Sequence, residues 1–185
     1  SSIGMDVMPS TTEITVSQLS RLVGLPGAPA IVDVRIDDDV AADPRFLPAS
    51  IRRDYRSVAE WAPAFAGQTV MVVCQRGLKL SQGAAAWLRH CGAEATSVEG
   101  GFEAWRDAGH LLVDPARLPP RDQAGRTLWV TRARPKIDRI ACPWLIRRFV
   151  DPQAVFLFVA PSEVEMVADR FRAAPFDVEN VFWSH

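Results

Sequence analysis

Short, nearly continuous runs of apolar residues recur along the first hundred positions, and polar or turn-forming residues separate them. The two clearest runs, residues 30–35 (AIVDVR) and 69–74 (TVMVVC), are rich in valine and isoleucine. Such runs are typical of parallel strands that are covered on both faces. A shorter run, residues 95–98, precedes a pair of glycines. We therefore predict three strands of a parallel sheet.

Apolar residues between and after these runs recur at helical spacing, which predicts helices over residues 16–23, 57–65, 79–90 and 102–108. Ser57 with Glu60 three positions later favours an N-cap, and Gly109 is placed to end the last helix. The alternation of strand and helix indicates an α/β fold with a parallel sheet, helices on both faces and a ligand site at the carboxyl ends of the strands.

The composition changes at residues 114–126 to proline, arginine, aspartate and glycine, as in a surface linker. We predict a domain over residues 1–113 and a second, smaller α/β domain over 127–185. The second domain should contain strands at 127–131 and 155–159 and helices at 137–149 and 162–171.

Two details of this second part carry expectations of their own. Pro143 should kink the helix at 137–149 or mark a restart, and Ser162 with Glu165 favours an N-cap. The last residues, 180–185 (NVFWSH), are apolar and strand-like without a polar tail, so we expect the second domain to be incomplete.

The bulk composition excludes some classes of protein. A chain of 185 residues with 48% hydrophobic residues can bury one substantial core and a smaller one. The formal net charge of -1 gives no general reason to expect nucleic acid or an anionic membrane as partner. The apolar runs are far shorter than the roughly 20 residues of a membrane span, so we expect a cytoplasmic protein. Three cysteines at irregular spacing favour reduced thiols.

Cys74 has the surroundings of a reactive thiol, because it follows a predicted buried strand and precedes a glycine turn and a helix. Backbone N–H groups in such a turn favour negative charge. Arg76 and Lys79 could add positive charge, so we expect Cys74 to be partly ionised at neutral pH, while Gly77 permits a tight loop. The alternative is a buried, inert cysteine at a strand end. The turn, the cations and the helix together favour a nucleophile.

Residues 16–113 resemble a single-domain rhodanese through residues 31–35 (IVDVR), 74–79 (CQRGLK) and 98–109 (VEGGFEAWRDAG). The resemblance implies that Cys74 accepts sulfane sulfur from a donor such as thiosulfate and passes it from a persulfide to a thiol or cyanide-like acceptor, without a cofactor. It implies further roles for other residues. Loop amides would come from Gln75, Arg76, Gly77, Leu78 and Lys79, structural support from Asp33 and Arg35, and a turn beneath the site from Gly100 and Gly101.

The loop departs from the family pattern in two places. Lys79 stands where the family has arginine, and Leu80 where serine or threonine follows directly. Lysine lacks the bidentate fork of arginine, so we expect weaker binding of oxyanion donors. The family's Gly-His-Ile-Pro-Gly-Ala stretch is altered to residues 45–51 (RFLPASI). A related phosphatase would need arginine six places after the cysteine, where this chain has Leu80, which argues against phosphate chemistry.

Residues 132–148 carry six positive charges against Asp138 alone, whereas acids predominate from Asp151 onward. The basic cluster could be neutralised within its domain or could bind an anion or nucleic acid. Residues 129–152 and 156–159 resemble the carboxy-terminal domain of the chromate-resistance protein family. Cys142, near Arg139, could bind or reduce an oxyanion such as chromate, or could simply pack.

Two functions of different classes therefore remain open. The first is a rhodanese-type sulfurtransferase with Cys74 as nucleophile in a chromate-resistance context. The second is a regulatory or binding module that senses sulfur species or chromate. No cluster of metal ligands is visible in the sequence, and we interpret Trp61, Trp87 and Trp105 as core residues.

Overall fold

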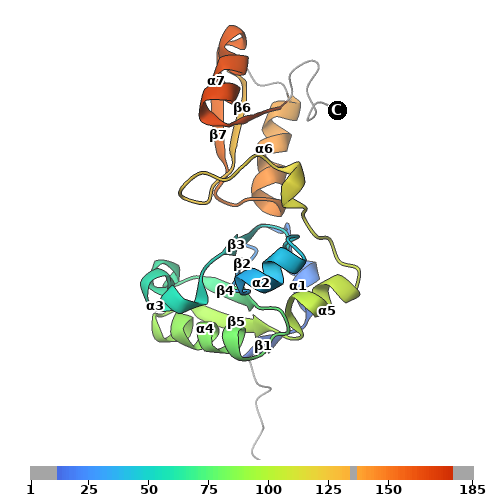
Figure 1. The fold of residues 1–185 in the computed structure, drawn as a ribbon, viewed down its shortest axis with the longest axis vertical. Coiled ribbons are helices and arrows are strands. Elements are labelled where there is room, and N and C mark those ends of the chain that lie inside the picture. Colours follow the sequence, from blue (N-terminus) through green and yellow to red (C-terminus); the bar gives the residue numbers. More distant parts are fainter. Residues whose placement is uncertain (1–11, 134–136, 177–185) are drawn as a thin grey trace, which may run out of the picture. The chain divides into compact units, whose positions relative to one another are not determined.

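The computed structural model describes residues 12–133 and 137–176, except for the side chains of residues 137–142. The chain divides into two compact units, which we treat separately. Unit 1 takes in the chain up to Leu22 together with Pro29–Ala42 and Ile51–His110. Unit 2 takes in Val23–Ala28, Asp43–Ser50 and the chain from Leu111 onward. Both units are α/β (Figure 1).

Unit 1 is built on a five-stranded sheet with the order β1-β5-β4-β2-β3. The strands are β1 (Glu13–Ile14), β2 (Ala30–Asp33), β3 (Ser50–Arg52), β4 (Thr69–Val73) and β5 (Glu94–Val98). The pairings of β1 with β5, β5 with β4 and β4 with β2 are all parallel. The three strands predicted from apolar runs are thus the centre of the sheet, with β1 and β3 added at its edges.

Four of the described helices of unit 1 lie in the connections between these strands, and a fifth follows the last strand. They are α1 (Val16–Leu22), α2 (Asp37–Ala42), α3 (Val58–Trp61), α4 (Lys79–His90) and α5 (Gly101–Asp107), with 3-10 turns at Tyr55–Ser57 and Ala62–Phe65. The bounds of α4 agree with the prediction, and Gly109 follows α5 with a φ of 75°, as expected for a helix-ending glycine. The acidic helix α2 was not predicted.

Alternation along the strands divides the core of unit 1 between the two faces of the sheet. Val32, Val70 and Val72 pack with Ala84 and Leu88 of α4 in one fully buried cluster. The side chains at the intervening strand positions point to the opposite face of the sheet, where α1 contacts α5. Figure 1 shows α3 and α4 on one side of the strands and α1 and α5 on the other. Helices therefore cover both faces, as the apolar strands require.

Unit 2 contains a three-stranded parallel sheet with the order β7-β6-β8. Its elements are β6 (Leu128–Arg132), α6 (Ile137–Phe149), β7 (Val155–Val159), α7 (Val164–Phe171) and β8 (Ala174–Pro175), with 3-10 turns at Pro115–Arg117 and Pro161–Glu163. Val130 of β6 packs with Val164 and Val167 of α7. Trp129 packs with a separate cluster that includes Ile146 of α6. The central strand thus has an apolar contact on each face.

The structure differs from three details of the predicted elements. Ser57 occupies the N-cap position of α3 as predicted, but its side chain makes no cap hydrogen bond. Ser162 lies inside a 3-10 turn, and Glu163 takes the N-cap position of α7 instead. Trp87 is 45% exposed, since Ala84, Ala85 and Leu88 form the inner face of α4. Trp105 is buried as expected, and Trp61 is half-buried against the core.

Other details concern α6 and the end of the chain. Helix α6 runs without interruption through Pro143, so the proline does not mark a restart. Residues 180–185 lie outside the described part of the chain. Within the described residues, every helix is too short or too polar to cross a membrane.

Candidate functional site

Cys74 follows the last residue of β4, at the carboxyl edge of the parallel sheet. Its side chain is only 5% exposed and packs against Val72 and Val34. The thiol donates a hydrogen bond of 3.1 Å to the hydroxyl oxygen of Ser81, in the first turn of α4. The Ser81 hydroxyl in turn donates to the carbonyl oxygen of Leu78 at 3.3 Å. The strand and the helix therefore position the sulfur through a defined polar contact.

The backbone from Gln75 to Ser81 forms the loop predicted around the sulfur. Among the described residues, the N–H groups of positions 75–81 donate to no acceptor, whereas the next amide, that of Gln82, bonds to the Leu78 carbonyl oxygen. Unpaired amides at the start of a helix favour an anion, and α4 adds the positive end of its dipole. The loop can therefore stabilise negative charge next to Cys74.

Close backbone packing holds this loop against the turn between β5 and α5. A Cβ atom on Gly77 would lie 2.5 Å from the Val98 carbonyl oxygen and 2.7 Å from the Gly100 nitrogen. A Cβ atom on Gly101 would overlap the Cys74 carbonyl oxygen, and both glycines have positive φ. The amide of Phe102 also donates to the Cys74 carbonyl oxygen at 2.9 Å. Gly100 and Gly101 thus turn beneath the site, where the resemblance placed them.

A pocket of about 550 Å³ opens over the loop. It is lined by all of the loop residues predicted to bind substrate except Gly77, and by Cys74, Leu80, Gln82, Asp39 and Glu103. Gly77 instead lies in the backbone contact with Gly100. The Lys79 side chain is exposed, and among the described residues it has no carboxylate partner, whereas Arg76 lies 3.6 Å from Glu103. The Lys79 ammonium group is thus available to contact an anion that enters this pocket.

Gln75 is held by the same acid, because its amide nitrogen donates to Glu103 at 3.3 Å. A carboxylate accepts only, which orients the amide nitrogen toward Glu103. The other amide atom, Oε1, is buried and has no hydrogen-bond partner within the described part of the chain. Gln75 therefore has one unsatisfied acceptor atom beside the loop.

Asp33 and Arg35 lie at the end of β2, next to the strand that carries Cys74. The guanidinium contacts the carboxylate at 2.9 Å, and both side chains are at most 3% exposed. The Arg35 guanidinium also lies 4.0 Å from the ring centre of Phe102, the residue whose amide bonds to Cys74. The pair thus links β2 to α5 beneath the loop.

Sequence reasoning did not assign a role to Ser81, Asp39 or Glu103. A weak signal for Ser81 was present, since the family pattern has a hydroxyl residue after the loop cation and here serine follows one position later, after Leu80. The contact shows that the hydroxyl is retained despite the shift. Asp39 and Glu103 come from α2 and α5, and no local pattern connects either acid to Cys74.

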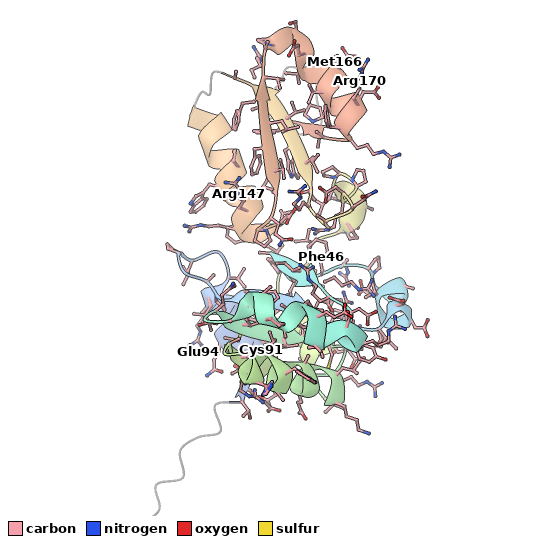
Figure 2. The ribbon with its side chains drawn as sticks, turned by 90° about the vertical axis from the view of Figure 1, so that its left-hand side faces the viewer. Phe46, Cys91, Glu94, Arg147, Met166 and Arg170 are labelled. Atoms are coloured by element: carbon pink, nitrogen blue, oxygen red, sulfur yellow. The ribbon has the colours of Figure 1, made fainter. Side chains whose placement is uncertain are left out.

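The candidates of unit 2 gain less support from the structure. Cys142 and Arg139 fall within α6, but their side chains lie outside the described residues. Further along α6 lies Arg147, which is labelled in Figure 2. Its guanidinium lies 4.7 Å from the ring centre of Phe156. In the described part of the chain, no group of three or more histidine, cysteine or acidic side chains could hold a metal ion.

Comparisons with known proteins match both halves of the chain. The family model for the rhodanese-like domain matches residues 15–108. The model for the C-terminal domain of ChrB matches residues 129–185. A curated relative, protein ChrB of Cupriavidus metallidurans, is 37% identical over 94 residues, which cover 44% of this chain and 28% of that protein.

Solved structures similar to the chain include rhodanese homologues. A rhodanese-related protein from Thermoplasma volcanium is 24% identical, with a TM-score of 0.48 over 55% of this chain and 96% of that one. A rhodanese-like domain protein from Staphylococcus aureus is 26% identical, also with a TM-score of 0.48, over 56% of this chain and 99% of that one. The family matches agree with the geometry at Cys74: this chain belongs to the rhodanese-like domain family, and a segment matching the C-terminal domain of ChrB follows.

Proposed function

We propose that this protein is a sulfurtransferase in which Cys74 carries sulfane sulfur as a persulfide. The observation that carries the proposal is the position of the Cys74 sulfur beneath a pocket whose loop amides are unpaired among the described residues. A persulfide is an anion at neutral pH and needs such donors, whereas a purely structural cysteine does not. The family match supports the same chemistry.

The reaction would proceed in two displacements. The Cys74 thiolate attacks the outer sulfur of thiosulfate, a sulfur–sulfur bond forms, and sulfite leaves with the electron pair of the broken bond. A thiolate or cyanide then attacks the outer sulfur of the persulfide, and the electron pair of that bond returns to Cys74. Both steps transfer one sulfur atom, and no external oxidant or reductant is consumed.

Three side chains would assist these steps. The Ser81 hydroxyl, which now accepts from the thiol, can rotate to donate to the ionised sulfur. Lys79 would attract an anionic donor as a point charge, with less geometric selection than an arginine fork. The Gln75 side chain would line the path of the incoming acceptor.

The setting we propose is chromate resistance in the cytoplasm. The match of residues 129–185 to the C-terminal domain of ChrB supports it. Cys74 and Cys91 are both free thiols, as a reducing compartment would keep them. Cys91 lies at the end of α4, half-buried against the core (Figure 2), and is a packing residue in this proposal.

A second candidate function follows from the same match. The rhodanese-like domain would then sense or hold sulfur species or chromate, and the ChrB-like segment would transmit the signal. Two features favour keeping this alternative: Lys79 replaces the oxyanion-binding arginine, and Cys142 and Arg139 lie close together in the sequence of α6. Chromate binding by the whole chain that depends on Cys142 and not on Cys74 would support it.

The test is a mass measurement after incubation with thiosulfate and removal of the excess. We expect a gain of about 32 Da, one sulfur atom, in wild type and in Cys91→Ser but not in Cys74→Ser. Cyanide should remove the added mass and release thiocyanate. Absence of added sulfur on folded wild type, with thiosulfate or with a small organic persulfide as donor, would contradict the enzyme proposal.

A further inference from the structure

Unit 1 contains a second pocket of about 570 Å³, separate from the one over the Cys74 loop. Residues 35–38, which follow β2, and residues 52–56, which begin at the end of β3, line it. Four of these nine residues are arginines. None of them belongs to the loop that surrounds Cys74.

The two pockets open at the same edge of the sheet. Strand β2 ends at Asp33 and β4 ends at Val73, and these two residues are register partners in neighbouring parallel strands. The segments that follow them, which carry Arg35 and Cys74, therefore emerge side by side. The first turn of α2 connects the pockets, because Asp37 and Asp38 line one and Asp39 lines the other. A small molecule that spans this turn could contact both.

Three of the four arginines already have carboxylate partners. Arg35 pairs with Asp33, Arg52 with Asp37 at 2.6 Å, and Arg56 with Asp54 at 2.9 Å. These carboxylates balance the charges of the three arginines. They leave little positive charge for a ligand.

Arg53 differs from these three. Within the described residues it has no carboxylate partner, and its guanidinium donates to the Arg52 carbonyl oxygen at 2.9 Å. The side chain is half-buried, and this burial lowers the pKa of Arg53. A guanidinium has five N–H donors, and withdrawing them from water without an anion costs free energy. An anionic ligand would offset that cost.

We propose that this pocket binds the carboxylate end of a small thiol that accepts sulfur from Cys74, with Arg53 as the binding group. The role as acceptor site rests on the proposed sulfurtransferase function, whereas anion binding at Arg53 does not. In the transfer, the acceptor thiolate forms a bond to the outer sulfur of the Cys74 persulfide, and that sulfur leaves on the acceptor as a new persulfide anion. The bond between the two persulfide sulfurs breaks, and its electron pair goes to Cys74.

Asp38 provides an opposing charge that sharpens the test. It lines the same pocket, is exposed, and has no cationic partner within the described part of the chain. An anion at Arg53 would be repelled by this carboxylate, although solvent screens the interaction. Removing the Arg53 charge and removing the Asp38 charge should therefore change anion binding in opposite directions.

The experiment uses the full chain with two acceptors of matched chemistry, mercaptosuccinate and neutral 2-mercaptoethanol. For Arg53→Met we expect KM for mercaptosuccinate to rise about tenfold, the size of one lost charge-assisted contact, with kcat unchanged. KM for 2-mercaptoethanol should not change. Asp38→Asn should lower KM for mercaptosuccinate by about two- to threefold. Arg21→Met, an exposed site on α1, is the control and should have no effect.

Calorimetric titration of mercaptosuccinate into protein without persulfide separates the two proposals. Saturable binding that weakens in Arg53→Met and tightens in Asp38→Asn supports the pocket even where no persulfide forms. Arg53→Lys, which keeps the charge but loses the fork, should fall between wild type and Arg53→Met. Binding that Arg53→Met leaves unchanged, or equal losses for both thiols in a folded variant, would overturn the inference.

Discussion

Each unit of this protein buries a carboxylate with hydrogen-bond partners, but at opposite ends of its sheet. In unit 1, Asp33 at the carboxyl end of β2 pairs with buried Arg35. In unit 2, Asp151 precedes β7 and is only 1% exposed. It accepts from the amide of Thr127 at 2.7 Å and from the Thr127 hydroxyl at 2.6 Å, just before β6. One carboxylate lies at the strand ends and the other at the strand starts.

This difference separates support of a site from support of a fold. Ligand sites of open parallel sheets form outside the carboxyl ends of the strands. Asp33 and Arg35 lie at that edge beside the strand of Cys74, so their geometry bears on the sulfur. Asp151 joins the starts of β6 and β7, away from the carboxyl edge. We expect substitutions of Asp33 or Arg35 to affect both the reactivity of Cys74 and the stability of the fold. We expect substitutions of Asp151 to affect stability alone.

Replacing Asp33 tests the first half of this comparison and should have the largest effect. In Asp33→Ala, the buried Arg35 guanidinium loses its carboxylate, which should cost about 3–5 kcal/mol of unfolding free energy. Reaction of Cys74 with thiosulfate should fall with it. Urea unfolding followed by tryptophan fluorescence, together with the mass assay for persulfide, measures both quantities.

A double substitution separates charge from packing at the same place. Asp33→Leu combined with Arg35→Met removes both charges, so most of the stability should return. Persulfide formation should recover less, because this variant lacks the guanidinium group that contacts the Phe102 ring in the wild type. Full recovery of activity in the double variant would mean that the ion pair has no role in positioning the loop.

Gly101 tests whether the reactive edge depends on close backbone packing. In Gly101→Ala, the new Cβ overlaps the Cys74 carbonyl oxygen at a positive φ. The strain and the overlap should together cost about 3 kcal/mol. Displacement of the loop should slow persulfide formation about a hundredfold. Gly109→Ala is the matched control, since its φ is also positive but its Cβ meets no atom within 4 Å.

Gly109→Ala should therefore lose about 1–2 kcal/mol and keep its activity. Thermal unfolding and the rate of sulfur loading measure the two variants in parallel. Equal rates of sulfur loading in Gly101→Ala and Gly109→Ala would show that the loop after Cys74 tolerates movement of the turn at Gly101.

Asp151 tests the other half of the comparison. Asp151→Ala leaves the buried Thr127 amide and hydroxyl without their acceptor, which should cost about 1–3 kcal/mol. Hydrogen exchange measured by mass spectrometry should accelerate in peptides covering β6 and not in those covering β4. Sulfur loading of Cys74 should remain at the wild-type rate. Loss of loading in a variant with intact β4 protection would contradict the separation of roles.

The parts of the fold that could be predicted from the sequence are those with strong local patterns. Strands β2 and β4 were found because burial on both faces leaves a nearly continuous apolar run, and helix α4 because burial of one face leaves apolar residues at helical spacing. The parts that were missed lack such local patterns. Strands β1 and β8 have two residues each and depend on pairing with distant strands.

The site divides in the same way. Cys74 and Gly77 could be identified because strand, turn and helix follow one another in the chain. Asp39 and Glu103 could not, since their approach to the pocket depends on how α2 and α5 pack around it. For Ser81 the sequence carried only the weak signal of a hydroxyl residue near the loop cation, and the contact with Cys74 appears only in the structure. The positions of Gly100 and Gly101 beneath the loop came from the family resemblance, and backbone contacts explain them.

Substitution of Ser81 should have a smaller effect than the substitutions above, because it removes a single hydrogen bond at the sulfur. In Ser81→Ala the ionised sulfur loses a hydroxyl donor, which is worth about 1 kcal/mol, or roughly a fivefold slower sulfur transfer. Ser81→Thr keeps the hydroxyl and should restore most of the rate. Stopped-flow measurement of thiocyanate release from loaded protein gives the rates directly, and iodoacetamide alkylation reports the reactivity of Cys74 without a sulfur donor.

A structural role for Ser81 would give a different pattern. Its side chain is fully buried, so both Ser81→Ala and Ser81→Thr would then change the unfolding free energy, and Ser81→Thr would be the worse because of its extra methyl group. A positioning role instead makes the reaction rate follow the hydroxyl while stability changes little in Ser81→Ala. The ranking of Ser81→Ala and Ser81→Thr by reaction rate therefore decides whether Ser81 acts on Cys74 through its hydrogen bond or only through packing.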